Sequence, residues 1–341
     1  MDLTDAERDM LTAALASRRR DQELPRRLRR DWLAERQRRA QADRVEHDGF
    51  ARGLLTSAGI DLAGTERRRE RNTADARAFL EQQRRTVIEQ SGGVAERHRA
   101  LARVRGEGLA AEQRSGAAGT YQLAALDTAS AIWAVHASPD ANNSVDVHID
   151  PPAPTHNAAK VYQSKQTSPD IRFHVPGIWI VDIHWAFRFP VADNVLLNAV
   201  TFVQALGADS LFASGWVLGD SYAQIDFSTR LDMFTVSPPP LQQVQPIGTG
   251  GHDEGPVRFL HSDWWDVLGQ FDSTVYDFQS TLIDKSFSHV SANSTVFILV
   301  TATLDLTADG NAFCVADFFN GDLQINVPAV YVSTFPDNPI P

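Results

Sequence analysis

The spacing of hydrophobic and polar residues divides the chain into two unlike parts. Before about residue 115, the apolar residues recur every three or four positions, which is the period of an α-helix. After about residue 120, apolar and polar residues alternate, which is the period of a β-strand. We therefore predict an α+β protein in which the two classes are segregated. A helical, coiled-coil-like arm spans residues 1–115, and an all-β antiparallel sandwich of jelly-roll type spans residues 116–341.

The beginning of the helical part carries a clear local pattern. Thr4 and Glu7 fit a capping box, in which the threonine hydroxyl accepts from a free N–H and the glutamate reaches back to the threonine amide. A narrow apolar stripe follows, made of Met10, Leu11, Ala14 and Leu15. Further along, Thr65 is expected to cap a third helix, and Gly92-Gly93 is expected to break or kink it.

Four apolar residues along this third helix lie seven positions apart: Leu80, Val87, Val94 and Leu101. The positions three residues after them are mostly polar, so the coiled-coil pattern is partial. Helices this poor in apolar residues gain little stability alone, so we expect them to need a partner. The prediction is a homo-oligomer held through these four positions, with a trimer as the favoured form.

Long alternating segments dominate the β-part. One face of the segment from Ile178 to Phe189 is aromatic and aliphatic, and the segment from Ser294 to Leu306 has the same pattern. Faces of this kind pack against a second sheet. Asn320-Gly321 is a strong hairpin signal, because both central positions of a type I′ turn need positive φ. We therefore predict three consecutive antiparallel strands near the C-terminus, the last two joined at this turn.

The charge is distributed unevenly between the two parts. The whole chain has a net charge of −11, but residues 1–115 hold 25 arginines against 20 acidic residues. The densest basic runs are Arg18–Arg20, Arg26–Arg30 and Arg67–Arg69. A basic arm can bind a polyanion such as nucleic acid. Acidic residues interleave with these runs and no aromatic motif accompanies them, so we favour ion pairs within the protein.

Several functional classes receive no support from the sequence. A single cysteine, Cys314, excludes an internal disulfide framework and a cysteine-based zinc site, and it is expected to be a small buried hydrophobe. No cofactor or nucleophile motif is present, so we predict neither a cofactor nor catalytic residues. The first residues are charged and no long apolar stretch occurs, which predicts a protein that is cytoplasmic at synthesis and carried, in one alternative, in a released particle.

Two groups of side chains are candidates for binding. Asp146, His148 and Asp150 alternate and share one face, so they form a candidate cation site, against the alternative of an ordinary polar strand face. Trp216, Trp264 and Trp265 form a candidate sugar-stacking group, against the alternative of core packing.

Two segments rich in Pro, Gly, Asn and His, 138–157 and 237–256, are expected to be surface loops long enough to bind a ligand. Asp182 and His184 are expected only to pair with their neighbours.

These patterns favour a non-enzymatic structural or binding protein. The order of helices first and β-head last resembles that of fibre, spike and adhesin-type proteins, an analogy of layout alone. We therefore expect an oligomeric fibre, spike or shell component of a larger, phage-like particle. The alternatives are a carbohydrate-binding protein or hydrolase that uses the two predicted loops, and a polyanion-binding protein that uses the basic arm.

Overall fold

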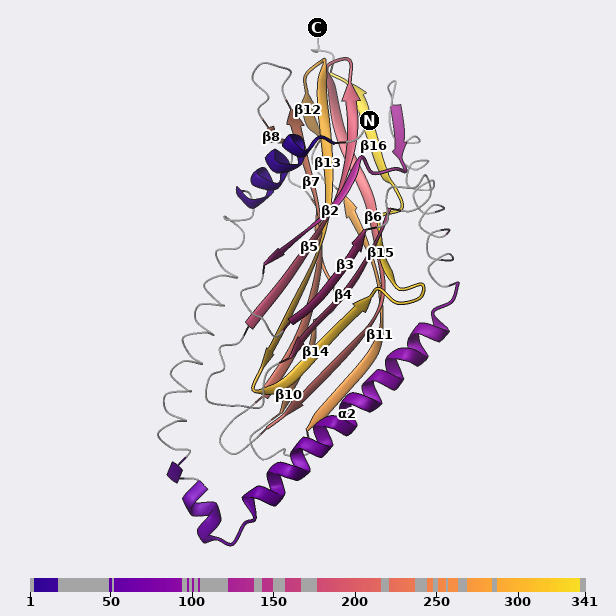
Figure 1. Cartoon of the computed structure of the whole chain (residues 1–341). Coiled ribbons are helices and arrows are strands. Elements are labelled where there is room, and N and C mark those ends of the chain that lie inside the picture. Colours follow the sequence, from indigo (N-terminus) through magenta and orange to yellow (C-terminus); the bar gives the residue numbers. More distant parts are fainter. Residues whose placement is uncertain are drawn as a thin grey trace.

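The computed structural model consists mostly of β-strands in two antiparallel sheets that face each other (Figure 1). The structure describes residues 3–17, 49–50, 52–93, 97, 100, 104, 122–137, 143–149, 157–166, 177–215, 221–236, 244–247, 251–255, 257–262, 269–283 and 287–337. The prediction of an antiparallel β-sandwich in the second part of the chain is thereby confirmed. None of the described helices is both long enough and apolar enough to cross a membrane.

Sheet A contains nine strands among the described residues, and the long strand β6 lies at its centre. Its members are β1 (Gln122–Leu126), β3 (Asn143–Ile149), β4 (Ala158–Gln166), β6 (Val195–Ser214), β11 (Gln270–Ile283), β12 (Ser288–Val290), β14 (Asn311–Phe318), β15 (Gln324–Asn326) and β16 (Val330–Pro336). β11 and β12 pair with one edge of β6, and β14, β15 and β16 pair with it in succession on the other.

Sheet B contains seven strands in the described part of the chain, in the order β10-β7-β13-β5-β2, with β8 and β9 also on β7. Their bounds are β2 (Ala131–Ala137), β5 (Gly177–Val191), β7 (Ser221–Val236), β8 (Val244–Ile247), β9 (His252–Glu254), β10 (Arg258–Ser262) and β13 (Ser294–Asp309). β13 pairs along almost its whole length with β5 on one side and β7 on the other. The two segments with the clearest alternation in the sequence are therefore direct neighbours at the centre of this sheet.

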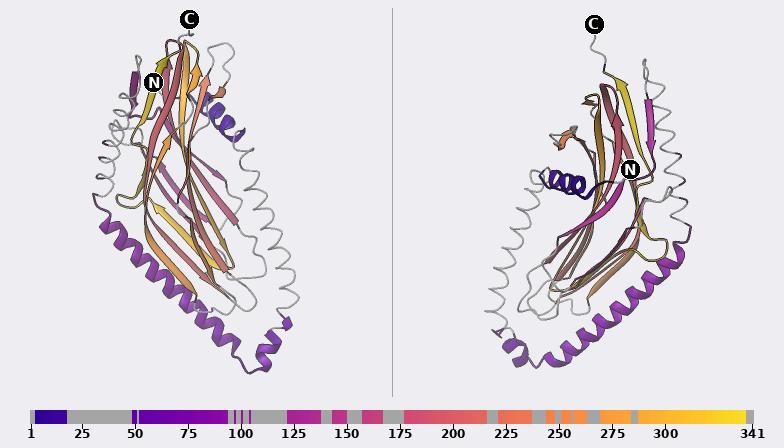
Figure 2. Two further views of the ribbon diagram at one scale, coloured as in Figure 1. Left: turned by 180° about the vertical axis from the view of Figure 1, so that it is seen from behind. Right: turned by 45° about the horizontal axis from the view of Figure 1, so that its top comes forward.

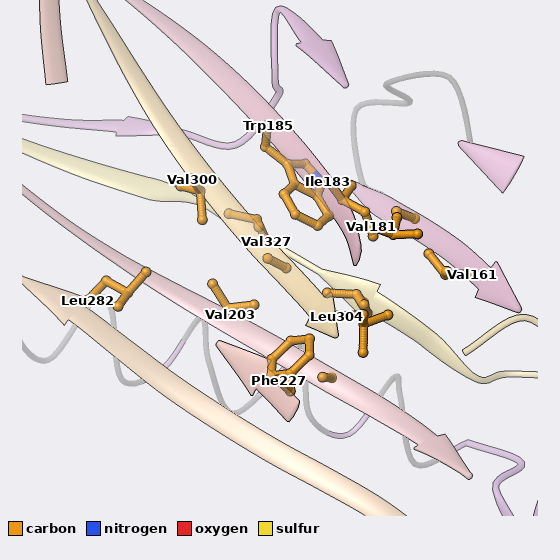
Figure 3. Packing of buried hydrophobic residues seen from close by; sticks show 14 of the residues in the cluster. Val161, Val181, Ile183, Trp185, Val203, Phe227, Leu282, Val300, Leu304 and Val327 are labelled. Carbon is orange, nitrogen blue, oxygen red and sulfur yellow. The ribbon is translucent and has the colours of Figure 1, made fainter. Parts of the chain in front are cut away.

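The core lies between the inner faces of the two sheets, where alternate side chains interdigitate (Figure 3). Trp185 and Phe227 are among its largest fully buried side chains. A buried polar side chain, Asn157, joins three segments: it accepts from the Ala129 amide at 3.0 Å and donates to the carbonyls of Asp127 and Val327, each at 2.9 Å. Its amide group thus satisfies backbone groups that would otherwise be buried without partners.

The three C-terminal strands predicted as a meander are arranged differently. β13 belongs to sheet B and β14 to sheet A, so the chain crosses between sheets at Gly310, whose φ is +72°. β14 and β15 do not form a hairpin either. Both lie between β6 and β4, one after the other in the same line, and residues 319–323 are a loop inserted between them. Gly321 has a φ of +61°, and Asn320 is not among the described residues with positive φ, so the type I′ prediction is wrong.

The helix over residues 5–17 lies on the outer face of sheet B (Figure 2). Its capping box is confirmed, because the Thr4 amide donates to Glu7 Oε2 at 2.9 Å and the Glu7 amide donates to Thr4 Oγ1 at 3.2 Å. Leu11 and Leu15 of the predicted stripe are buried against Phe297 and neighbouring apolar residues of the sheet. This helix therefore takes its partner from the same chain.

The long helix α2 (Leu62–Gln90) lies on the other side of the sandwich, over β6 and β11 of sheet A (Figures 1 and 2). Asp61 caps it by accepting from the Gly64 amide at 2.9 Å, so the prediction of Thr65 as the cap is wrong by one turn. The helix ends at Gln90, before Gly92-Gly93, as expected. The Gly93 amide then donates to Asp322 Oδ2 at 3.0 Å, which ties this end to the loop inserted after β14.

The heptad positions of α2 have partners in the sandwich of the same chain. Leu80 is buried against Phe212 and Phe313, and Val87 packs with Leu206. Val94 and Leu101 lie outside the described residues. The coiled coil is not seen, and the described helices are not a free arm, because a helix with one narrow apolar stripe can bury that stripe on a sheet as well as on a copy of itself.

The two segments expected to be loops contain strands. Residues 143–149 within the segment 138–157 form β3 on the edge of β4, and the segment 237–256 contributes β8 and β9 to the edge of β7. Both predictions are wrong for these residues. Pro and Gly are compatible with short edge strands, because an edge strand needs hydrogen bonds on one side only.

Candidate binding site

Three aromatic rings gather on the outer face of sheet B, at the edge formed by β10. Phe259 and His261 of β10 have nearly parallel rings, 8° apart in plane with centroids 6.4 Å apart, and Tyr222 of β7 lies 6.1 Å from Phe259. Phe259 is 56% exposed, although it is a large apolar side chain. We call Tyr222, Phe259 and His261 the aromatic platform. An exposed cluster of this kind offers flat apolar surface with polar groups at its rim.

Polar side chains of β7, β13 and β5 lie beside the platform on the outer face of sheet B. The register places Asp226 opposite Asp305 and Thr303 opposite Asp182 on neighbouring strands, so these side chains share the outer face. Gln224 donates to Asp226 Oδ2 at 2.7 Å. We call these side chains the polar face. Its carboxylate oxygens and hydroxyl groups suit a ligand that both donates and accepts hydrogen bonds.

Members of the polar face contact one another through hydrogen bonds. Thr303 donates to Asp182 Oδ1 at 2.6 Å, and His184 Nδ1 lies 2.9 Å from Thr301 Oγ1. The prediction that Asp182 and His184 pair with their neighbours is confirmed. The His184 ring also contacts Trp133, with centroids 5.1 Å apart, at the border of the surface covered by the N-terminal helix.

An ion pair holds Arg230, one of the arginines on the outer face of sheet B. Arg230 makes two contacts with Asp232, 2.7 Å from Nε to Oδ2 and 2.8 Å from Nη2 to Oδ1. Asp232 is fully buried, so the positive charge of Arg230 is committed to it. Asp182, Asp226 and Asp305 place three further carboxylates on the polar face.

The candidate tryptophans lie outside the described residues, but the strands that lead to them are described. Trp216 belongs to the connection from β6 to β7, and Trp264 and Trp265 belong to the connection from β10 to β11. The ends of these connections meet, because the Gly215 amide donates to Ser262 Oγ at 3.0 Å. Both connections therefore begin at one end of the sandwich, next to the aromatic platform.

The residues of the candidate cation site lie in and just after β3. The backbones of Asp146 and His148 lie in β3, opposite Tyr162 and Lys160 of β4, and Asp150 lies outside the described residues. Among the residues that the structure describes, no three His, Cys, Asp or Glu side chains come together as a metal site. The alternation of Asp146 and His148 agrees with their place in a strand, as the sequence predicted.

Two ionisable groups lie inside the sandwich. Cys314 is buried, and burial raises the pKa of its thiol to about 12, in agreement with the prediction of a small buried hydrophobe. Asp209 of β6 is also buried, close to Arg258 of β10, and burial raises the pKa of its carboxyl from 3.8 to about 6.

Three arginines of α2, Arg77, Arg84 and Arg85, contact other side chains of the chain. Arg84 pairs with Glu81 at 2.7 Å and with the buried Asp317 at 3.3 Å, and its guanidinium lies over the Tyr162 ring, 5.3 Å from the centroid. Burial acts to lower the pKa of Arg84, but these acidic groups outweigh it and the pKa is raised. Of the three basic runs, 18–20 and 26–30 lie outside the described residues, whereas Arg67 and Arg68 are exposed on α2.

Sequence reasoning missed the aromatic platform. Its members come from two strands that are far apart in the chain, and the five-residue strand β10 was not predicted. One signal was present: Phe259 and His261 alternate just before Trp264-Trp265, so four aromatic rings occur within seven residues. That signal shows a concentration of aromatic residues without showing that Phe259 is exposed.

Comparison with known proteins adds no family. No protein-family model and no curated protein matches the sequence. Among solved structures, the chain is similar to the carbohydrate-binding module TmCBM61 in complex with β-1,4-galactotriose, with 7% identity over 57% of this chain and 86% of that one, and a TM-score of 0.17. The CBM22-1 xylan-binding domain from Paenibacillus barcinonensis gives 12% identity over 62% and 98%, with a TM-score of 0.14. Tailspike protein 4 of bacteriophage CBA120 gives 10% over 59% and 19%, with a TM-score of 0.16. Similarity this low leaves the function to be argued from the residues of this chain.

Proposed function

We propose that this protein is a non-enzymatic binding protein whose outer face of sheet B binds a neutral glycan. The observation that carries the proposal is the exposed aromatic platform, in which Phe259 is 56% exposed beside the nearly parallel ring of His261. An aromatic ring gives a sugar ring an apolar surface on which to stack, and it loses little conformational entropy because it has two torsions.

The neighbouring polar face supplies the second requirement of glycan binding. A sugar presents hydroxyl groups that donate and accept hydrogen bonds, and Gln224, Asp226 and Thr303 present matching groups beside the platform. The carboxylates of Asp182, Asp226 and Asp305 on this face disfavour sialylated or uronic-acid glycans, because like charges brought together are destabilising. The ligand class is therefore a neutral oligosaccharide.

Glycan-array screening followed by calorimetry with the best neutral oligosaccharide tests the proposal. Phe259→Ala is expected to weaken binding about 30-fold, which corresponds to the loss of about 2 kcal/mol from an aromatic anchor. Trp264→Ala and Trp265→Ala are expected to weaken it as well, since their connection begins beside the platform. Absence of saturable binding to any neutral glycan would refute the proposal.

The matched control is Phe287→Ala. Phe287 is 53% exposed, close to the value for Phe259, but it packs on Phe335 just before β12, at the opposite end of the sandwich from β10 (Figure 1). Its replacement is expected to leave the affinity unchanged. Equal loss in both variants would show that exposed phenylalanines act through the stability of the fold rather than through the platform.

We further propose that the protein works as a component of a larger particle, such as a fibre, spike or shell. The supporting observation is β11, which pairs only with β6 among the described strands and exposes Phe271, Val275 and Ile283 on the outer face of sheet A, where Phe271 also contacts Phe79 of α2. Exposed apolar edges of this length form contacts with other chains. Light scattering of the full chain tests it: wild type is expected to form an oligomer, a trimer being favoured, and Val275→Glu is expected to dissociate it. A wild-type monomer at micromolar concentration would refute this second proposal.

A further inference from the structure

The short helix over the described residues 49–50 and 52–57 differs from the N-terminal helix and α2 in where its apolar side chains lie. The other two helices each bury an apolar stripe on the outer face of a sheet. Phe50 and Leu54 are four residues apart and so share one face of the short helix, yet they are 72% and 60% exposed. Ile60, which follows this helix, is exposed as well. We call Phe50, Leu54 and Ile60 the apolar tip.

A second exposed apolar surface lies on the outer face of sheet A, beside α2. Phe271, Val275 and Ile283 of β11 share this face, because they alternate along the strand with the buried Tyr276 and Leu282. β11 pairs only with β6 among the described strands, so in the described part of the chain no strand covers its other edge. We call Phe271, Val275 and Ile283 the β11 strip.

The apolar tip and the β11 strip of one chain are held apart by α2. The tip lies beyond the end of the sandwich, where the chain enters α2 (Figures 1 and 2). Phe79 is the residue of α2 that contacts the strip, through Phe271 at 5.1 Å between ring centroids. A helix rises about 1.5 Å per residue, so the part of α2 from Leu62 to Phe79 is about 25 Å long. Val275 lies still farther along, opposite Ala208 of β6, which is covered by a later turn of α2. The tip therefore does not reach the strip of its own chain.

The charges beside these two apolar surfaces are opposite in sign. Residues 49–72, around the tip, contain five arginines against three acidic residues, and Arg67 and Arg68 are exposed there. Residues 270–283, which form β11, contain two aspartates and no basic residue, and Asp277 is exposed on the same face as the strip. The tip and the strip thus complement each other in charge as well as in apolar character.

We propose that the apolar tip of one copy docks on the β11 strip of a second copy. The proposal rests on the second proposed function, since it names the surface that meets β11 when chains assemble. Such a contact joins two different surfaces and is therefore heterologous. A pair of copies keeps one free tip and one free strip, so assembly continues until a ring closes. Closure after three copies gives the favoured trimer.

The chain already uses this mode of docking within itself. α2 buries Leu80 and Val87 on the outer face of sheet A, over the strand next to β11. A short helix from a second copy that lies on β11 buries Phe50 and Leu54 in the same way, and it brings its arginines toward Asp277. Burial of apolar surface supplies the free energy of this contact, and the opposite charges favour one orientation.

Analytical ultracentrifugation of full-length variants tests the contact. Phe50→Asp and Val275→Glu are each expected to weaken self-association by about 30-fold or more, as expected for the loss of a central apolar anchor. Both side chains are exposed in the single chain, so circular dichroism should show an unchanged fold. Phe287→Asp is the matched control, because Phe287 is as exposed as Phe271 but lies just before β12, far from the tip, and it should assemble as wild type (Figure 1).

Mixing the two variants separates this contact from one between two β11 strands. At concentrations where each variant alone is a monomer, the mixture offers one intact combination, the tip of Val275→Glu and the strip of Phe50→Asp. It is expected to form a dimer and nothing larger.

Three outcomes would overturn the proposal. If Phe50→Asp stays oligomeric while Val275→Glu dissociates, the second proposed function stands and the tip is not the partner of β11. If that Phe50→Asp oligomer has also lost the binding of wild type to phosphatidylglycerol vesicles, the tip belongs to a lipid surface. A mixture of the two variants that stays monomeric excludes the heterologous contact, and a wild-type monomer removes the second proposed function together with it.

Discussion

Replacement of Arg84 by alanine is expected to destabilise the protein by about 3 kcal/mol. Asp317 is fully buried and pairs with Arg84, whose side chain is 16% exposed. Loss of one partner of a fully buried pair costs about 3–5 kcal/mol. Three donors would remain on Asp317, the amides of Phe319 and Asn320 and the side chain of Asn320, so the electrostatic cost falls to about 2–3 kcal/mol. Lost contact with the Tyr162 ring adds about 0.5–1 kcal/mol.

Urea denaturation followed by tryptophan fluorescence measures this change. The matched control is Arg85→Ala, since Arg85 is the next residue of α2, is 72% exposed and pairs with the same Glu81 at 3.4 Å. Exposed pairs contribute about 0–1 kcal/mol, so this variant should remain close to wild type. Arg84→Met combined with Asp317→Asn removes both charges and is expected to recover part of the loss. Equal stabilities of Arg84→Ala and Arg85→Ala would refute the inference that this ion pair docks α2 on sheet A.

Three other outcomes follow from the contacts described above. Asn157→Ala should cost about 2–3 kcal/mol in urea denaturation, because two buried backbone groups and one partly buried carbonyl lose their partner. Thr4→Ala should destabilise the N-terminal helix by about 1 kcal/mol, seen as faster amide exchange over residues 5–17, and unchanged exchange there would contradict the capping box. The raised pKa of Asp209 means that the folded state binds the extra proton, so wild type should lose roughly 1–3 kcal/mol relative to Asp209→Asn as the pH rises from about 4 to about 7. Parallel stability curves for these two proteins would contradict this last expectation.

The faces of the long strands were predictable from the sequence. Period-two alternation placed Trp179, Val181, Ile183 and Trp185 on one side of a strand, and these side chains do lie in the core between the sheets. The capping box was predictable for the same reason, since it involves only residues within one turn. In each case the free energy depends on neighbours in sequence, so the pattern of residues carries the information.

The partners of these elements depended on the tertiary structure. Leu80 was correctly expected to be buried on a helix, but its contact with Phe212 and Phe313 in the same chain has no local sign. Asn320-Gly321 favoured a hairpin locally, whereas pairing of both flanking strands with β4 and β6 made it part of an inserted loop. Non-local hydrogen bonds and burial outweighed the preference of a two-residue turn.

The candidate site shows most clearly which features are visible in the sequence and which depend on the tertiary structure. The sequence by itself shows that Phe259 and His261 alternate just before Trp264-Trp265, but it did not predict the strand β10 that carries them. Only the pairing of Arg258–Ser262 with Ser221–Ile225 brought Tyr222 beside Phe259, and only the approach of β6 and β11 placed Asp209 within reach of Arg258. Strand pairing joins residues that are far apart along the chain. Its energy is a sum over many long-range contacts, and no short window of sequence contains that sum.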